Sequence, residues 1–443
     1  MLESTPLIPI VALGLLVAGV VLVVRRDLDR GARPRPWDLA WAVPAALALL
    51  ACAVVCSLGL YERAHDGLTL AILSAAALVE GACALLRRPA LDALDRLAGR
   101  GETWRARTEA LRAAAAAGCV IFSCALGWVA LELPWNGSIL SMGPTFSALE
   151  ALIILVFLVL LFFVSQRRGA GVAAGVWALW VTGVAQYFVA RFKEAAILPN
   201  DLLALGTAAE VSGGYVFSVN HLVALGTAAA LLATAACAFA VPSRCAARED
   251  LRRNVLGNAA AALVAAGCLW GVVSTDFGEA YGLEIAYWNS LSSYESHGFL
   301  PSFIKVAQDL PIERPQGYSD EAAAQTEGAY AAAYDAGRGS SPERAAAEEQ
   351  FDQVRPSIVC IMNETFSDLS IYDGLGVGYA GPTFYRSWAS DPRTVGSGSL
   401  AVSVLGGGTC NTEFELLTGV PLAYVGNGKY PFMLYDLEQS PSL

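Results

Sequence analysis

The chain has 443 residues, of which 55% are apolar and 16% are charged, and its formal net charge at pH 7 is -11. This composition excludes an intrinsically disordered chain, which has few apolar residues, and it disfavours a purely soluble enzyme. Most of the apolar residues lie in long runs before position 276. The sequence therefore predicts a membrane part followed by a soluble part.

Eight apolar runs in the first part reach or approach the roughly 20 residues that a helix needs to cross the hydrocarbon core of a membrane. They lie near 7–24, 39–60, 68–86, 113–133, 147–165, 170–190, 221–241 and 255–275. We predict a polytopic α-helical membrane domain of about eight spans over residues 1–276. Glu80 is the one acid well inside a predicted span, and we interpret it as a snorkelling or helix-paired carboxylate, with a functional role as the alternative.

Basic residues are distributed unevenly over the loops between these runs. The loops after the first, third, fifth and seventh runs hold 18 arginines, whereas the alternate loops hold only Arg63, Arg191 and Lys193. Because basic loops stay on the cytoplasmic side, this bias places both termini on the outer face. Segment 276–443 then faces outward with 22 acidic and 8 basic residues, which makes nucleic acid a poor partner.

Residues 277–354 are predicted to form a juxtamembrane helical linker. Alanine-rich, acidic sequence at 320–353 indicates an exposed helix, a break at 339–342 and a second helix. Aromatic residues closer to the membrane suit its interface, and they are Tyr281, Tyr287, Trp288 and Phe299.

The first motif whose residues could bind a metal or take part in a reaction begins after Pro356. Residues 357–362 form a short, apolar, β-branched run that is typical of a strand buried on both faces of a parallel sheet. Asn363 and Glu364 follow at its carboxyl end, the edge at which ligands bind in open α/β sheets. Glu364 is therefore a candidate metal ligand, with the start of an exposed loop or a helix cap as the alternative.

A second unit combines a predicted strand at 399–405, a glycine turn at 406–408 and a short helix from Thr409 to Thr418. Three glycines allow the backbone to approach a ligand closely, and a helix start offers unpaired N–H groups to an anion. Thr412 and Glu415 fit a capping box, which would explain part of this motif structurally.

The two units together, PSIVCIMNETFSD at 356–368 and GGGTCNTEFE at 406–415, resemble the lipoteichoic acid synthase family. Stretches at 288–304 and 315–321 also look like the region that joins anchor and catalytic domain in that family. Its members are phosphoglycerol transferases of the sulfatase and alkaline phosphatase superfamily. The resemblance implies that 355–443 is the N-terminal part of an extracytoplasmic α/β domain of that type, carried on a multi-pass protein of the cell membrane.

The resemblance also implies roles for particular residues. Glu364 matches the acidic metal ligand, and Thr409 matches the threonine that is both nucleophile and metal ligand. The metal would be Mn²⁺ or Mg²⁺, which activates a hydroxyl and holds a phosphoryl oxygen. Phosphatidylglycerol would give glycerophosphate to Thr409, and a hydroxyl of an envelope glycopolymer would collect it. Asn411 and Glu413 stand in the same motif with supporting or capping roles.

One departure from the family concerns the later half of the active site. Family members complete the metal site with an Asp-His pair and bind substrate through further histidine and arginine residues. The three histidines of this chain, His65, His221 and His297, all precede Thr409. We therefore expect a catalytic domain that is truncated at Leu443, with a degenerate, inactive relative as the alternative.

Other classes of function stay open at this stage. A related phosphoethanolamine transferase, a sulfatase-like hydrolase and a noncatalytic membrane protein are alternatives. The CxPxR context of formylglycine sulfatases is absent from the sequence, which disfavours a true sulfatase.

Overall fold

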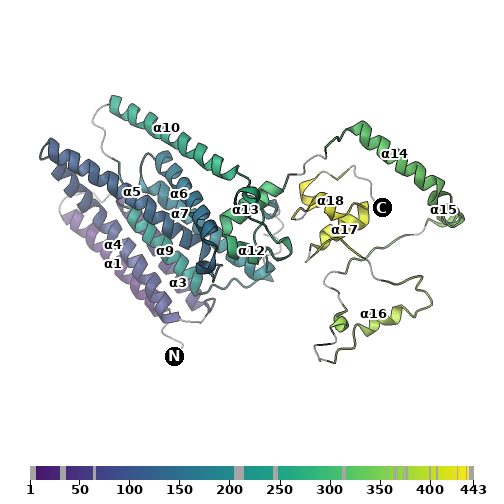
Figure 1. Ribbon diagram of the computed structural model, residues 1–443. Helices are drawn as coiled ribbons and strands as arrows, with labels where there is room; N and C mark the ends of the chain where they lie inside the picture. The colour runs from purple at the N-terminus through teal and green to yellow at the C-terminus, as the bar shows by residue number, and fades with distance from the viewer. Residues whose placement is uncertain are drawn as a thin grey trace. The chain divides into compact units, whose positions relative to one another are not determined.

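The computed structural model describes residues 6–29, 36–62, 66–203, 214–242, 248–311, 316–355, 357–363, 366, 368–372, 374, 378–398, 401–405, 408–426, 428–435 and 437–438. Two compact units divide the chain, Met1–Asp309 and Leu310–Leu443. Figure 1 shows the first as a bundle of long helices. Across these ranges the regular structure is helical, apart from one isolated bridge between Tyr61 and Val219.

Seven helices in the described ranges are long and apolar enough to cross a membrane, so the chain is a multi-pass membrane protein. In chain order they are α1 (Leu7–Asp29), the run Trp37–Ser57, α4 (Asp66–Ala98), α5 (Glu102–Glu132), α6 (Pro144–Val164), α7 (Gly169–Lys193) and α10 (Arg248–Val273). The run Trp37–Ser57 combines most of α2 (Pro36–Leu39), a 3₁₀ turn at Ala40–Ala42 and α3 (Val43–Ser57). The remaining predicted span is α9 (His221–Cys237), which has 17 residues.

The count of long spans is thus seven, one fewer than predicted. The apolar run at 221–241 is helical only as far as Cys237. At about 1.5 Å per residue, α9 is about 26 Å long, which is less than the ~30 Å thickness of the hydrocarbon core. Composition alone could not show where the helix ends.

Helix α9 nevertheless lies at the centre of the bundle, against α4, α5 and α7 (Figure 1). Small residues allow this close packing: a Cβ on Gly169, the first residue of α7, would stand 1.9 Å from the carbonyl oxygen of Cys237. Polar pairs also join the helices, since the indole N–H of Trp177 donates to the hydroxyl of Thr234 at 3.0 Å. The short helix is therefore held by its neighbours on most of its surface.

Three short helices follow α10 and belong to the same unit: α11 (Phe277–Tyr281), α12 (Ser290–His297) and α13 (Phe299–Asp309). Phe277 and Leu283 are fully buried in a cluster with Leu149 and Ile153 of α6. Helix α13 packs against the N-terminal end of α6. This contact positions the buried carboxyl groups described below.

The second unit begins with two exposed helices, α14 (Asp320–Ala336) and α15 (Pro342–Val354). The hydroxyls of Ser319 and Ser341 accept hydrogen bonds from backbone N–H groups in the first turns, at 3.1 and 3.2 Å, and so cap the two helices. A short 3₁₀ turn at Arg338–Ser340 separates them. The predicted pair of exposed helices with a break near 339 is confirmed.

The last part of this unit contains α16 (Thr383–Trp388), α17 (Thr409–Thr418), α18 (Leu422–Val425) and α19 (Pro431–Leu434). Phe414, Leu422 and Val425 form its small buried cluster, with Val404 packed against them. This cluster fixes α17 against α18 and the chain before it. It therefore positions Thr409, at the start of α17.

The strands predicted at 357–362 and 399–405 are not observed. Described residues of both segments have no strand partner, and Ile361 is 85% exposed. A β-branched run expresses a local preference, but a buried strand also needs neighbouring strands to receive its backbone hydrogen bonds. The α/β domain is thus not shown in the described part of 355–443.

Candidate functional site

The predicted nucleophile Thr409 is the first residue of α17. Gly408 before it has φ +79°, in the left-handed region that glycine adopts without strain, and turns the chain into the helix. Thr409 is half-buried, and its hydroxyl forms no hydrogen bond with any described residue. It can therefore take an external partner beside the N–H groups of a helix start, which favour an anion.

Asn411 holds the first turn of α17 in place. Its side chain is buried, with 5% exposed, and its amide Nδ2 donates to the carbonyl oxygen of Lys429 at 2.9 Å. Its backbone N–H donates to the carbonyl oxygen of Gly408 at 2.8 Å. These contacts give Asn411 a supporting role at the start of the helix.

Glu415 does not form the predicted capping box with Thr412. The N-cap of α17 is Gly408, which has no side-chain oxygen, so the helix has no side-chain cap. The carboxylate of Glu415 instead accepts hydrogen bonds from the hydroxyl of Ser403 and from the backbone N–H of Leu422, the latter at 2.6 Å. These hydrogen bonds lower the pKa of Glu415. The residue ties α17 to the segment before it and to α18.

The predicted metal site is not assembled within the described residues. Glu364 lies outside them, as do Gly406 and Gly407, so its position relative to Thr409 is not described. Glu413 is exposed on α17. In the parts of the chain that are described, no three His, Cys, Asp or Glu side chains gather as metal ligands would.

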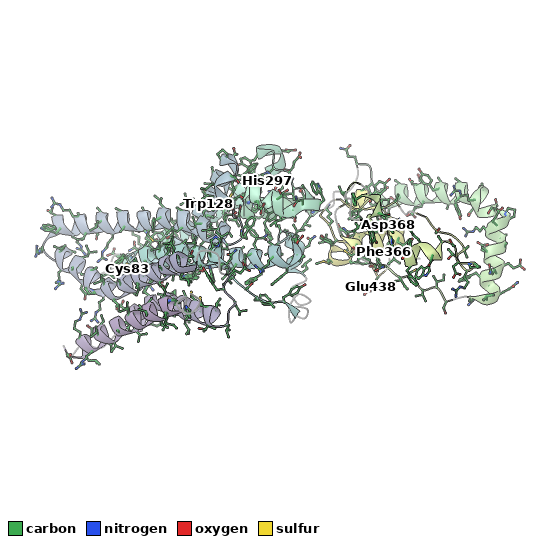
Figure 2. The ribbon with its side chains drawn as sticks, turned by 90° about the horizontal axis from the view of Figure 1, so that it is seen from below. Cys83, Trp128, His297, Phe366, Asp368 and Glu438 are labelled. Atoms are coloured by element: carbon green, nitrogen blue, oxygen red, sulfur yellow. The ribbon has the colours of Figure 1, made fainter. Side chains whose placement is uncertain are left out.

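Asp368, at the end of the first motif, is engaged by its own neighbours. It accepts hydrogen bonds from the hydroxyl of Ser370 at 2.6 Å and from the guanidinium of Arg386 at 2.5 Å. These contacts lower the pKa of Asp368. Figure 2 shows Asp368 with Phe366 in the second unit. Its carboxylate is thus used within the chain.

A second site lies in the membrane unit, where Glu132 of α5 and Glu150 of α6 are both completely buried. One oxygen of Glu132 accepts the backbone N–H of Phe299 at 2.8 Å, and one oxygen of Glu150 accepts that of Leu300 at 2.9 Å. These are the first two residues of α13. The start of α13 is thus held by one carboxyl group from each of two membrane helices.

Neighbouring side chains complete this buried carboxyl pair. The indole N–H of Trp128 donates to the other oxygen of Glu150 at 2.9 Å, and the amide of Asn136 donates to Glu132 at 3.3 Å. Gly298 has φ +83°, and a Cβ there would stand 2.5 Å from the Glu150 carboxylate. Only glycine allows this backbone to approach the carboxylate so closely.

His297, the residue before Gly298, borders the same site. Its ring packs edge-on against Phe146, with 4.4 Å between ring centroids. Burial lowers the pKa of His297, and its Nδ1 atom has no hydrogen-bond partner among the described residues. Figure 2 shows His297 and Trp128 at the same end of the membrane bundle, whereas Cys83 lies away from them.

Glu80 differs from the carboxyl pair. It is 1% exposed on α4, and neither carboxylate oxygen has a hydrogen-bond partner in the part of the chain that the structure describes. The expected snorkelling or pairing with another helix is therefore not observed. A buried carboxyl group without a partner is costly inside a membrane, which keeps a functional role for Glu80 open.

No family model, curated protein or solved structure matches this chain. The resemblance stated from the sequence thus has no support from these comparisons. Function must be argued from the site itself.

Sequence reasoning missed Glu132 and Glu150. A signal was present, because the two acids lie at the ends of neighbouring predicted spans, 113–133 and 147–165. Acidic residues are common at the ends of spans, because water is close there. The sequence positions of Glu132 and Glu150 therefore could not show that these two acids are buried.

Proposed function

We propose that the chain is a membrane-anchored transferase that moves phosphoglycerol from phosphatidylglycerol to an envelope glycopolymer, with Thr409 as nucleophile. The observation that carries the proposal is the Thr409 hydroxyl, which starts a helix after a left-handed glycine and has no hydrogen-bond partner among the described residues. A free hydroxyl beside helix N–H groups suits attack on a phosphate diester, because those groups stabilise the negative charge of the phosphoryl oxygens.

Two further features support a lipid substrate. Seven long apolar helices place the chain in a membrane, where its phospholipid donor would also lie. The 18 arginines on alternate loops favour an outward position for Thr409, on the side where envelope polymers are built. A soluble phosphate donor would not require either feature.

The proposed chemistry has two displacements at phosphorus. The oxygen of Thr409 attacks phosphorus, the bond from phosphorus to the diacylglycerol oxygen breaks, and the threonine proton ends on diacylglycerol. In the second step a hydroxyl of the acceptor attacks, the bond from phosphorus to the threonine oxygen breaks, and the acceptor's proton returns to Thr409. Asn411 keeps the helix start fixed in both steps through its bond to Lys429.

A divalent cation, Mn²⁺ or Mg²⁺, would be held by Glu364 and Thr409 in this proposal, and it would supply Lewis-acid stabilisation of the phosphoryl group. The unpartnered hydroxyl of Thr409 fits a ligand role. Glu364 lies outside the described residues. The remaining ligands are therefore not assigned.

The test follows release of labelled diacylglycerol from vesicles that contain the protein. Thr409→Ala should abolish release, because it removes the attacking oxygen, whereas Thr409→Ser should keep part of the activity. Thr412→Ala is the matched control, since it removes a threonine hydroxyl from the same helix, and it should stay active. Normal turnover by a folded Thr409→Ala protein would refute the proposal.

The lipid headgroup and the acceptor are tested in the same assay. Phosphatidylglycerol should be consumed and phosphatidylethanolamine of the same acyl chains should not. Label from the glycerol headgroup should appear on a glycopolymer acceptor rather than as free glycerol phosphate. Consumption of phosphatidylethanolamine alone would replace this proposal with phosphoethanolamine transfer, and release of free glycerol phosphate alone would replace it with hydrolysis.

A further inference from the structure

A pocket of about 600 Å³ lies between α5 and α6, at the end of the membrane helices away from α12 and α13. The small side chains of Ala113, Ala116 and Ala117 on α5 leave the space, and Phe162 and Phe163 of α6 form the opposite wall. Ala113 and Ala117 are exposed on the outer surface of the helix bundle, so the pocket is open on that side. Residues 113–133 are a predicted span, so the pocket faces the membrane.

Arg167 lines the mouth of this pocket and is held by α10. Its Nε donates to the amide oxygen of Asn258 at 2.8 Å, and the amide nitrogen of Asn258 donates to Gln166 at 2.9 Å. Asn258 is buried, with 4% exposed, so it is a fixed support. The guanidinium carbon of Arg167 also lies 5.8 Å from the ring centroid of Phe163.

The backbone at this point is unusual. Gln166 and Arg167 both have φ 60°, the left-handed region that non-glycine residues seldom adopt. Such a conformation persists only where the surroundings of the residue determine it. Here the side chain of Asn258 accepts a hydrogen bond from Arg167 and donates one to Gln166. The strained turn thus directs Arg167 to the pocket.

The charges at the mouth are not equivalent. Arg112 of α5 also lines the pocket, but its guanidinium is paired with Asp95 at 2.5 Å. Glu109, one turn before Ala113, adds a negative charge on the α5 side. Arg167 forms no ion pair with a described residue, and its two terminal nitrogens make no hydrogen bond with one. Of the two arginines that line the pocket, it is the one not paired with a described acid.

We propose that this pocket binds one anionic phospholipid, with its phosphate on Arg167 and an acyl chain between α5 and α6. The apolar walls match an acyl chain, and the planar guanidinium donates two parallel hydrogen bonds to phosphate oxygens. Basic pockets between membrane helices on the cytoplasmic side are recurrent headgroup sites, and the loops at this end hold the 18 arginines. Since Thr409 is not involved, the site is independent of the proposed transferase function.

The charge is tested with the full chain in a neutral detergent, by thermal unfolding at increasing phosphatidylglycerol or phosphatidylcholine of the same acyl chains. Phosphatidylglycerol should raise the unfolding temperature at lower concentration than phosphatidylcholine. Arg167→Gln should weaken the apparent phosphatidylglycerol affinity about tenfold. Arg168→Gln removes the adjacent exposed arginine and should change nothing. Wild-type affinity in Arg167→Gln, or equal affinity for the two lipids, would overturn the proposal.

The apolar part is tested by filling the pocket without changing its charge. Ala117→Phe should occupy the space between the helices and weaken phosphatidylglycerol binding, whereas Ala115→Phe, on an exposed position of α5 that does not line the pocket, should not. Size-exclusion chromatography checks that both variants are folded. Inorganic phosphate alone should not stabilise the chain. Full binding by a folded Ala117→Phe variant, or the same stabilisation by inorganic phosphate, would contradict a lipid site.

Discussion

Truncation of Glu150 to alanine should release α13 from the membrane helices. The substitution leaves two donors without their acceptor, the backbone N–H of Leu300 and the indole N–H of Trp128, which now bind Glu150 at 2.9 Å each. An unsatisfied buried donor costs about 1 to 3 kcal/mol, and because both residues are half-buried we take the lower end for each, about 2 kcal/mol together. The loss should fall on the docking of α13, because the N–H of Leu300 lies in the first turn of that helix.

Hydrogen exchange of the α13 amides measures this loss directly. A cost of about 2 kcal/mol or more corresponds to opening that is about 30-fold or more frequent. Glu80→Ala is the matched control, because it removes the same atoms from a buried membrane helix where neither oxygen has a hydrogen-bond partner among the described residues. It should leave α13 exchange unchanged. Equal exchange in the two variants would refute the assigned role of the buried carboxyl pair.

Three other substitutions test the remaining contacts. Gly169→Ala should cost about 1 to 3 kcal/mol in thermal unfolding, because its methyl group would overlap the Cys237 carbonyl, whereas Gly118→Ala meets open space and should not destabilise. His297→Phe should remove a loss of stability that the wild type shows as pH falls below about 6.5. Burial lowers the folded-state pKa of His297, so the unfolded chain binds the proton first, and a wild-type profile in the variant would contradict this role. Glu415→Gln should speed hydrogen exchange in α17 relative to Glu413→Gln, because Glu415 accepts hydrogen bonds from Ser403 and Leu422; equal exchange would exclude that tie.

The membrane helices could be predicted from the sequence because their signal is local. The hydropathy of an apolar run depends only on its own residues and needs no distant partner. Each of the eight predicted spans corresponds to an apolar helix. The length of α9 was not predictable in the same way. Its centre is enclosed by α4, α5 and α7, and that packing, rather than its own composition, holds it in the bundle.

The buried carboxyl pair could not be found because its partners are distant in sequence. Phe299 lies 167 residues after Glu132, and Leu300 lies 150 residues after Glu150. Thr409 is the opposite case, since Gly408 and the helix that follows are adjacent in the chain and the turn was predicted from them. The strand prediction at 357–362 failed for the same reason as the missed pair, because ladder partners are long-range.

The lipid pocket and the buried carboxyl pair lie at opposite ends of α6, and they should act independently. Glu150 is in the second turn of α6 and Arg167 follows its last turn, so about 25 Å of helix separates them at about 1.5 Å per residue. Coupling over that distance needs an element with two alternative arrangements. Helix α6 is one continuous helix packed on α5, α7 and α10, which favours a single arrangement. The destabilisations caused by Arg167→Gln and Glu150→Ala, measured in phosphatidylglycerol, should therefore add within about 0.5 kcal/mol in the double variant. A larger deviation would show that the two ends communicate, and α6 would then be the element to examine for a second conformation.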